Sequence, residues 1–368
     1  MNRLQALLDA LPIPIIQAPM AGASSPQMAL AVSRAGGLGS VAAAAFSPDE
    51  IETSIAAVRA ATDAPFSVNL LVTKSQAPQA VELDEALARL KSWYDEAGIP
   101  LPERPNRFSH DFDAQFAAVL AAGPPIASFA FDLIDRERIA ALQQAGSLVV
   151  GTANTVAEAR AWAEAGADGV CAQGMEAGGH RGNFLREVES SLVGTMALVA
   201  TVRAAVDLPV IAAGGIMDGR GVAAALALGA SGAQLGSAFL MADEAITGPI
   251  WQAAIRQAPD DPTGLSRAFT GRHARGLENR FMRDTRGIEA AAPAYPIQNR
   301  LTQPLRAAAA AAGDPEMMSL WAGQAVKLAR PGPAALMVQQ WWTEAQETSR
   351  MLTRRTGVPA PSLTPQGA

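Results

Sequence analysis

Eight short apolar runs recur along the first two thirds of the chain, and alanine-rich segments of helical length separate most of them. Several of these segments end in a helix-stop signal such as Ala35-Gly36-Gly37 or Ala165-Gly166. Strands that alternate with helices pack as a parallel sheet, so the sequence predicts an α/β fold, a parallel (β/α)8 TIM barrel. A doubly wound sheet is the alternative. The runs are Ile13–Pro19, Leu38–Ala43, Phe66–Val72, Ile126–Phe131, Leu148–Ala153, Gly169–Gln173, Val210–Gly214 and Ala233–Phe239.

Two stretches interrupt this repeat and set the predicted domain organisation. Residues 73–123 are too long for one crossover, so we expect an excursion that carries an extra helix. Residues 242–312 are predicted to form a smaller, mostly helical lid over the mouth of a barrel built from residues 1–241. Residues 313–356 are expected to form helices that pack back on the barrel. The proline-containing tail, 357–368, is expected to be mobile.

Composition narrows the possible partners. Hydrophobic residues make up 49% of the 368 positions, which is enough for a large core, and a net charge of −6 without a basic cluster argues against nucleic acid. The single cysteine, Cys171, cannot form an internal disulfide, which favours a reducing compartment. The N-terminal residues lack the features of a signal peptide, and no 18-residue apolar run is free of breakers. We therefore expect a cytoplasmic monomer or homodimer that binds small molecules and no membrane.

The stretch Gly169–Gly182, GVCAQGMEAGGHRG, contains the strongest candidate for a catalytic residue. An apolar strand opens there into a glycine-rich turn, as expected of a ligand pocket at the carboxyl edge of a parallel sheet. Gly178 and Gly179 allow the backbone to approach a ligand closely. His180 is the side chain in this turn whose usual pKa lies near neutrality, so we predict that it is catalytic.

The other predicted binding residues follow the strands, where ligands meet barrels of this kind. The amide of Asn69 can donate to and accept from a heteroaromatic ring. Glycine-rich loops follow the seventh and eighth strands, and such loops form a recurrent phosphate site. We expect a cofactor phosphate near Gly215 and Gly236. The predicted cofactor-binding residues are Ala18, Pro19, Met20, Asn69, Gln173, Gly178, Gly179, Gly214, Gly215, Gln234, Leu235, Gly236 and Ser237.

Other reactive side chains have weaker surroundings. Glu176 and His180 could suggest a metal pair, but glycines between them disfavour a helix and no second histidine is near, so no metal site is predicted. Cys171 lies in a predicted buried strand and is not expected to act as a nucleophile. His110 and His273 are expected at the surface or in the lid.

Several motifs, taken in this order, resemble those of the nitronate monooxygenase family, formerly called 2-nitropropane dioxygenases. They are APMAG, FSVN ending at Asn69, AQGMEAGGHRG, AAGGIMDG and GAQLGSAF, while YPIQN and WAGQ suggest the first class of the family. The resemblance runs from about Ile13 to Gln324. It implies a (β/α)8 barrel with non-covalent FMN that oxidises alkyl nitronates with molecular oxygen to carbonyl compounds and nitrite through a flavin semiquinone. It also implies that His180 lines the substrate side of the flavin.

The resemblance is incomplete at the substrate wall. The fourth strand often reads SFHFG in the first class of the family, whereas this chain has Ala130 at the position of the histidine. Near Tyr295, relatives often carry a tyrosine and a lysine where this chain has Asn299 and Gln303. We predict that Ala130, Tyr295 and Asn299 form this wall. Two alternatives stay open: an FMN-dependent NAD(P)H oxidoreductase acting on quinones or enoyl thioesters, and a flavin-binding barrel without the ancestral activity.

Overall fold

A computed structural model describes residues 2–73 and 79–356, and it contains the predicted barrel. Eight parallel strands are hydrogen-bonded in the order β1-β9-β8-β6-β5-β4-β3-β2. The two ends of this sheet meet, because Gln17 N donates to Leu38 O and Leu38 N donates to Ile15 O, both at 2.9 Å. The prediction of a (β/α)8 barrel is confirmed. The strands are β1 (Ile15–Gln17), β2 (Gly39–Ala42), β3 (Phe66–Leu71), β4 (Ile126–Ala130), β5 (Leu148–Ala153), β6 (Gly169–Gln173), β8 (Val210–Ala213) and β9 (Gly232–Leu235).

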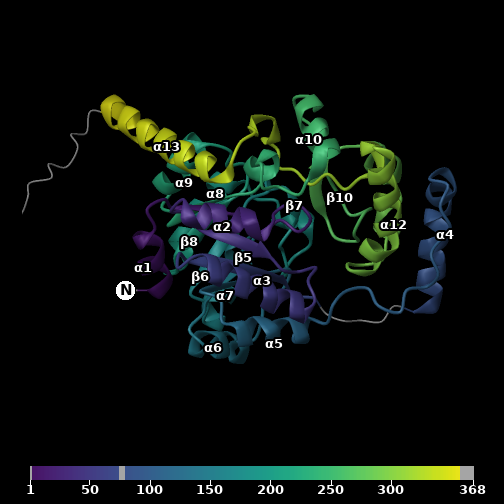
Figure 1. The fold of residues 1–368 in the computed structure, drawn as a ribbon, viewed down its shortest axis with the longest axis horizontal. Coiled ribbons are helices and arrows are strands. Elements are labelled where there is room, and N and C mark those ends of the chain that lie inside the picture. The colour runs from purple at the N-terminus through teal and green to yellow at the C-terminus, as the bar shows by residue number, and fades with distance from the viewer. Residues whose placement is uncertain (1, 74–78, 357–368) are drawn as a thin grey trace, which may run out of the picture.

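Seven helices surround the barrel and bury their apolar faces against the outer side of the strands (Figure 1). Their starts follow from local sequence. Ser47, for example, caps α3 in a capping box with Glu50, and a proline follows it at the first helical position. The helices are α2 (Pro26–Arg34), α3 (Pro48–Ala61), α5 (Phe112–Ala122), α6 (Arg136–Gln144), α7 (Val156–Ala165), α8 (Thr195–Ala205) and α9 (Gly219–Ala227).

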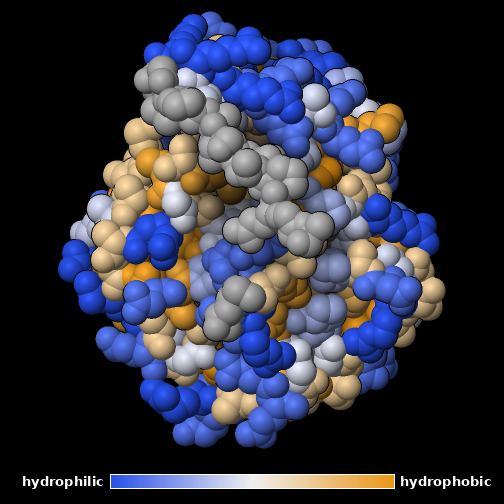
Figure 2. Space-filling model, turned by 90° about the vertical axis from the view of Figure 1, so that its left-hand side faces the viewer, coloured by the Kyte–Doolittle hydropathy of each residue, from blue (hydrophilic) through white to orange (hydrophobic). Residues whose placement is uncertain are grey.

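Helix α1 (Arg3–Ala10) closes the amino-terminal end of the barrel. Its Leu4 and Leu8 are buried in one cluster with strand residues that include Val150 and Cys171. Figure 2 shows the end of the molecule to which α1 and α13 belong, where hydrophilic and hydrophobic residues are interspersed. Because ligand sites of such barrels lie at the carboxyl ends of the strands, this plug leaves the opposite end for the site.

A second unit lies beside the barrel, on the right in Figure 1. To the predicted helices it adds an antiparallel sheet, ordered β10-β11-β7, which the sequence analysis did not predict. Strand β7 is the Gly179–His180 turn itself, in which His180 pairs with Ala274 and Gly179 with Arg275. The glycine-rich turn therefore leaves the barrel and becomes an edge strand of the second unit. Its other elements are α10 (Gly248–Gln257), β10 (Thr263–Ser266), β11 (Ala274–Leu277), α11 (Arg280–Thr285) and α12 (Ile297–Ala312).

Helix α4 (Ala80–Glu96) is the extra helix of the excursion, and it packs on the second unit. Its apolar face, which includes Leu87 and Leu90, is buried in one cluster with Leu301 and Leu305 of α12. The buried Tyr94 hydroxyl donates to Leu301 O at 2.6 Å. We therefore assign α4 to the lid, although the sequence analysis placed it with the barrel.

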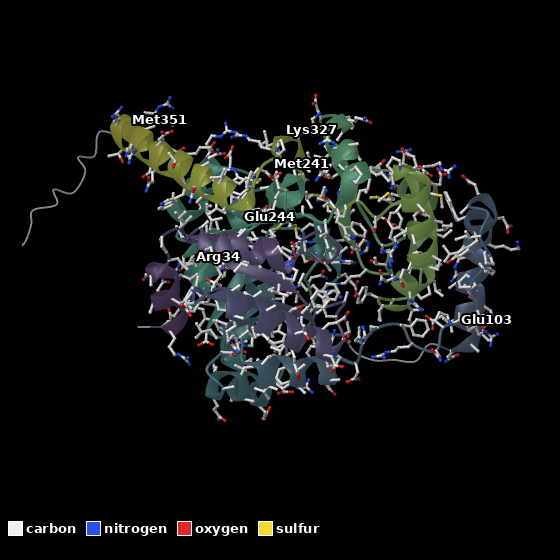
Figure 3. All side chains as sticks on the ribbon, in the orientation of Figure 1. Arg34, Glu103, Met241, Glu244, Lys327 and Met351 are labelled. Atoms are coloured by element: carbon white, nitrogen blue, oxygen red, sulfur yellow. The ribbon has the colours of Figure 1, made fainter. Side chains whose placement is uncertain are left out.

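The chain ends on the barrel side with α13 (Ala334–Thr356), which packs on α9 and α2. Trp341 meets Phe239 with 5.0 Å between ring centroids. The carboxylate of Glu244, labelled in Figure 3, accepts from Ala334 N at 2.9 Å. This bond fixes the start of α13. The predicted mobile tail, 357–368, lies outside the described residues. Short 3-10 helices are η1 (Val188–Ser191), η2 (Ser237–Met241), η3 (Glu289–Ala291), η4 (Pro315–Met317) and η5 (Val326–Leu328).

Within the described ranges, no helix combines the length and the apolar character needed to cross a membrane. The same part of the chain holds no group of three or more histidine, cysteine or acidic side chains arranged to bind a metal ion.

Candidate active site

A cavity of about 750 Å³ lies where the carboxyl ends of the strands meet the second unit. It brings together all but one of the predicted site residues. The exception is Leu235, whose side chain is buried in the core of the barrel. The predicted residues that line the cavity are Ala18, Pro19, Met20, Asn69, Ala130, Gln173, Gly178, Gly179, His180, Gly214, Gly215, Gln234, Gly236, Ser237, Tyr295 and Asn299.

Glycines form a cradle at the barrel side of the cavity. Gly214 and Gly215 both have positive φ, +112° and +71°, which side chains other than glycine rarely adopt. Within the described residues, the Gly215 N–H donates to no other group. Ser237 Oγ accepts from Gly323 N at 2.7 Å, so its own proton remains free to be donated. A free backbone N–H and a free hydroxyl proton, on loops that a ligand can approach closely, fit a phosphate group.

A side chain at Gly215 or Gly323 would crowd Glu176. A Cβ at Gly215 would lie 3.2 Å from Glu176 Cβ, and one at Gly323 would lie 2.8 Å from Glu176 O. The carboxylate of Glu176 is bound elsewhere, because it accepts from Thr195 N and from Thr195 Oγ1 at the start of α8. The cradle therefore presents backbone and hydroxyl donors without a competing carboxylate.

His180 stands at the lid side of the same cavity. Its Nε2 is 2.9 Å from Thr270 Oγ1, and its ring centroid lies 5.5 Å from that of Phe131, 5.6 Å from Tyr295 and 5.4 Å from Trp321. Burial, reinforced by the nearby guanidinium groups, lowers the pKa of His180 to about 3. The imidazole is therefore neutral at physiological pH.

Gln173 holds the histidine turn in place. Its Oε1 accepts from Asn154 Nδ2 at 2.9 Å and from Gly182 N at 3.0 Å, while its Nε2 donates to His180 O at 3.2 Å. These contacts occupy both lone pairs of the carbonyl and one N–H of the amide. One N–H of Gln173 remains for a ligand in the cavity.

Two buried charged side chains, Arg181 and Glu158, also hydrogen-bond to the backbone of this turn or next to it. The guanidinium of Arg181, which is 1% exposed, donates to Gly174 O at 2.7 Å and to Gln173 O at 3.2 Å. Burial lowers the pKa of Arg181 to about 10, so the group stays charged. On the other side, the fully buried Glu158 accepts from Phe184 N at 2.8 Å. The turn that carries His180 is thus rigidly held.

The amides of Asn69 and Gln234 also reach the cavity. Asn69 Nδ2 donates to Ser128 O and Oγ at 3.2 and 3.1 Å, which orients Oδ1 as the free acceptor. Gln234 Nε2 lies 3.5 Å from Cys171 Sγ. Burial raises the pKa of the Cys171 thiol to about 12, so this sulfur is a neutral thiol and a poor nucleophile.

The predicted substrate wall contains a strained residue next to Ala130. Phe131 has φ +86°, in the left-handed region that bulky residues avoid at a cost of roughly 1–3 kcal/mol. This turn directs the ring toward His180 and toward Tyr295, at 5.3 Å between centroids. The guanidinium of Arg272 stacks on the ring at 4.1 Å. The strained backbone at the end of β4 thus builds an aromatic wall around the imidazole.

Arg306 brings a positive charge to this wall, and within the described part of the chain no acidic side chain forms an ion pair with it. It donates to Asn299 O at 2.7 Å and to Asn299 Oδ1 at 2.8 Å, while its buried Nε has no hydrogen-bond partner. Burial lowers the pKa of Arg306 to about 10, which leaves it charged. Among the described residues that line the cavity there is no aspartate or glutamate. Because a buried cation is costly unless paired, this wall is suited to an anionic ligand.

Several residues of the site were missed by the sequence analysis. Arg306 could have been found, because residues 299, 303 and 306 share one face of a helix and two of them were already under discussion. Phe131 is the last residue of the predicted strand Ile126–Phe131 but follows β4 in the structure, where it has left-handed φ. Trp321 belongs to the WAGQ motif but was not assigned to the site, and no local pattern indicates Thr270. Their contacts with His180 depend on the unpredicted pairing of β7 with β11. His110, expected at the surface or in the lid, lines the rim of the cavity beside Arg107.

Comparison with known proteins gives consistent matches over most of the chain. A family model described as nitronate monooxygenase matches residues 3–344. A protein named probable nitronate monooxygenase, from Staphylococcus aureus strain Newman, is 39% identical over 334 residues, which cover 90% of this chain and 94% of that protein.

Solved structures give the same result for the fold. The nitroalkane oxidase from Streptomyces ansochromogenes superposes with a TM-score of 0.87 at 43% identity, covering 94% of this chain and 99% of that one. FabK from Thermotoga maritima superposes with a TM-score of 0.75 at 30% identity, covering 96% and 99%.

Proposed function

The chain belongs to the nitronate monooxygenase family, and we propose that it is an FMN-dependent enzyme that oxidises alkyl nitronates with molecular oxygen to carbonyl compounds and nitrite. It is an oxidoreductase, like the relatives it matches. The observation that carries the proposal is one cavity with a donor-lined glycine cradle at one side and a neutral imidazole among aromatic rings at the other.

The residues of the cradle fit the phosphate end of FMN. A Cβ at Gly214, Gly215 or Gly236 would lie 2.8, 3.2 or 3.4 Å from neighbouring protein atoms, so these positions favour glycine, and Ser237 offers a free hydroxyl proton. Asn69 and Gln173 each keep one polar group for the edge of the ring system. FMN would supply the redox chemistry, and the protein binds and orients it.

The charges around His180 favour a substrate that arrives as an anion. With a pKa of about 3, the imidazole is neutral at physiological pH, and the positive charge of this wall comes from the guanidinium groups. The same guanidinium groups, Arg272 and Arg306, that lower this pKa stabilise a negative charge beside the ring. The protein therefore favours the nitronate, the anion that a nitroalkane forms on losing its α-proton.

The visible spectrum of the purified protein tests the proposal. We expect a flavin spectrum that changes on anaerobic addition of propionate 3-nitronate and does not change with NADPH. Oxygen should then be consumed when air is admitted. Bleaching by NADPH alone would favour the reductase alternative. A colourless protein that does not bind added FMN would contradict both enzymatic assignments.

Arg306 is expected to select nitronates that carry a second negative charge. Replacing it in Arg306→Met should lower kcat/KM for propionate 3-nitronate by about 10–100-fold, because the carboxylate loses a desolvated cation. The loss for propyl-2-nitronate, which has no carboxylate, should be several times smaller. Arg300→Met is the matched control, since Arg300 also lines the cavity but is exposed at its rim. Equal losses on both substrates would contradict this role.

A further inference from the structure

Thr270 connects the lid to the imidazole through a single hydroxyl group. The residue is 1% exposed and lies in the loop between β10 and β11. Its Oγ1 is 2.9 Å from His180 Nε2 and 3.0 Å from Arg272 O. Both distances are ordinary hydrogen bonds. The hydroxyl also accepts a longer bond from Arg272 N at 3.4 Å. Its single proton can go either to His180 Nε2 or to Arg272 O, but not to both.

The carbonyl of Arg272 decides where that proton goes. A carbonyl oxygen can only accept, and the Thr270 hydroxyl is the donor that the described residues offer it. The hydroxyl thus donates to Arg272 O and must accept from His180. Nε2 is then the protonated nitrogen of the neutral ring. Nδ1 makes no hydrogen bond with any described residue and is not one of the buried unpartnered polar atoms, so it opens to the cavity.

The backbone keeps this arrangement in register. Strand β7 pairs with β11 at His180 and Ala274, and Arg181 N donates to His273 O at 2.9 Å. Arg272 Nε donates back to Arg181 O, also at 2.9 Å. These contacts hold the Thr270 loop and the histidine strand together on both sides of the side-chain bond. The bond is therefore built into the fold and does not depend on a mobile side chain.

We propose that Thr270 is a positioning residue that fixes His180 with Nε2 protonated and presents the Nδ1 lone pair to the substrate. This inference rests on the proposed function, because its consequence concerns nitro compounds. When the substrate is a neutral nitroalkane, the α C–H bond breaks and its proton moves to Nδ1. The electron pair of that bond spreads onto the nitro oxygens and gives the nitronate. A nitronate supplied as such has no proton to lose.

The tautomer is measured directly by NMR of the FMN-loaded protein with ¹⁵N-labelled histidine rings. The chain has three histidines, and His180→Asn assigns the signal of interest. We expect wild type and Thr270→Ser to show one ring state with Nε2 protonated and Nδ1 unprotonated. Thr270→Val, which is of similar size without the hydroxyl, should show a changed ring state. A protonated Nδ1 in wild type, or an unchanged signal in Thr270→Val, would overturn the proposal.

Kinetics separate positioning from a general structural role. Thr270→Val should lower turnover of 2-nitropropane by about tenfold or more, as expected when an acid–base group is misplaced, and turnover of propyl-2-nitronate by less than about threefold. Thr270→Ser should restore the first rate. Equal losses on both substrates would overturn the proposal. A wild-type protein that oxidises neither substrate would contradict the proposed function, whereas the NMR result stands without turnover and decides the tautomer by itself.

Discussion

Replacement of His180 by asparagine is expected to leave a yellow, FMN-containing protein whose turnover of 2-nitropropane falls by about 10²–10⁴-fold. Asparagine is too short to replace Nε2 of the histidine, and its amide cannot accept the α-proton of the substrate. FMN retention should not change, because the cradle at Gly215 and Ser237 lies on the barrel and His180 on the lid sheet. The measurement is nitrite release together with the ratio of flavin to protein.

The pH dependence gives a second check on His180. A histidine whose pKa is lowered loses its proton more readily, so the wild-type ring is neutral above about pH 3–4. The profile of kcat/KM should therefore show no fall due to His180 between about pH 8 and pH 5. His273→Asn is the control variant for His180→Asn and should keep the wild-type kinetics, since His273 is half-buried outside the cavity. Unchanged kinetics in His180→Asn would show that His180 takes no part in the reaction.

The second large effect is expected at the cradle. Gly215→Val should weaken FMN binding by at least about tenfold, and the protein should purify largely colourless. The φ of +71° is strained for valine, and the Cβ would lie 3.2 Å from Glu176 Cβ. Crowding against Glu176 would also displace the loop that carries the Gly215 N–H, one of the donors of the cradle. Flavin content after purification and a titration of apoprotein with FMN measure the effect.

Gly146→Val is the matched control for backbone strain. Gly146 has φ +94°, and no atom lies within 4 Å of the position its Cβ would take. It follows α6, outside the residues that line the cavity. This variant carries the backbone strain without the crowding, so it should lower the thermal stability while keeping its FMN. Comparable loss of FMN in both variants would show that Gly215 acts through stability and not through the cradle.

The barrel and the cradle were predictable because their signals are local. Each strand is a short apolar run bounded by glycine or polar residues, and glycines at Gly214 and Gly236 follow directly from strand ends. The lid side of the site was less predictable. His180 meets Thr270, Tyr295 and Trp321 only because the turn becomes strand β7 and pairs with residues more than 90 positions later. Two glycines and a histidine are too short a stretch to show a hydrophobic periodicity, so the sequence does not indicate the strand with which the turn pairs.

The placement of His180 on the lid sheet has a mechanical consequence. Strand β7 pairs with β11, whereas the glycine cradle is formed by loops of the barrel. A tilt of the second unit relative to the barrel would pull the imidazole against the contacts that Gln173 makes with the turn, while the cradle stays with the barrel. Loosening the contact between the two units should therefore slow the reaction before it releases the cofactor. The distance between flavin and His180 therefore depends on the interface between the barrel and the second unit. Substitutions in that interface, far from the cavity, can change this distance.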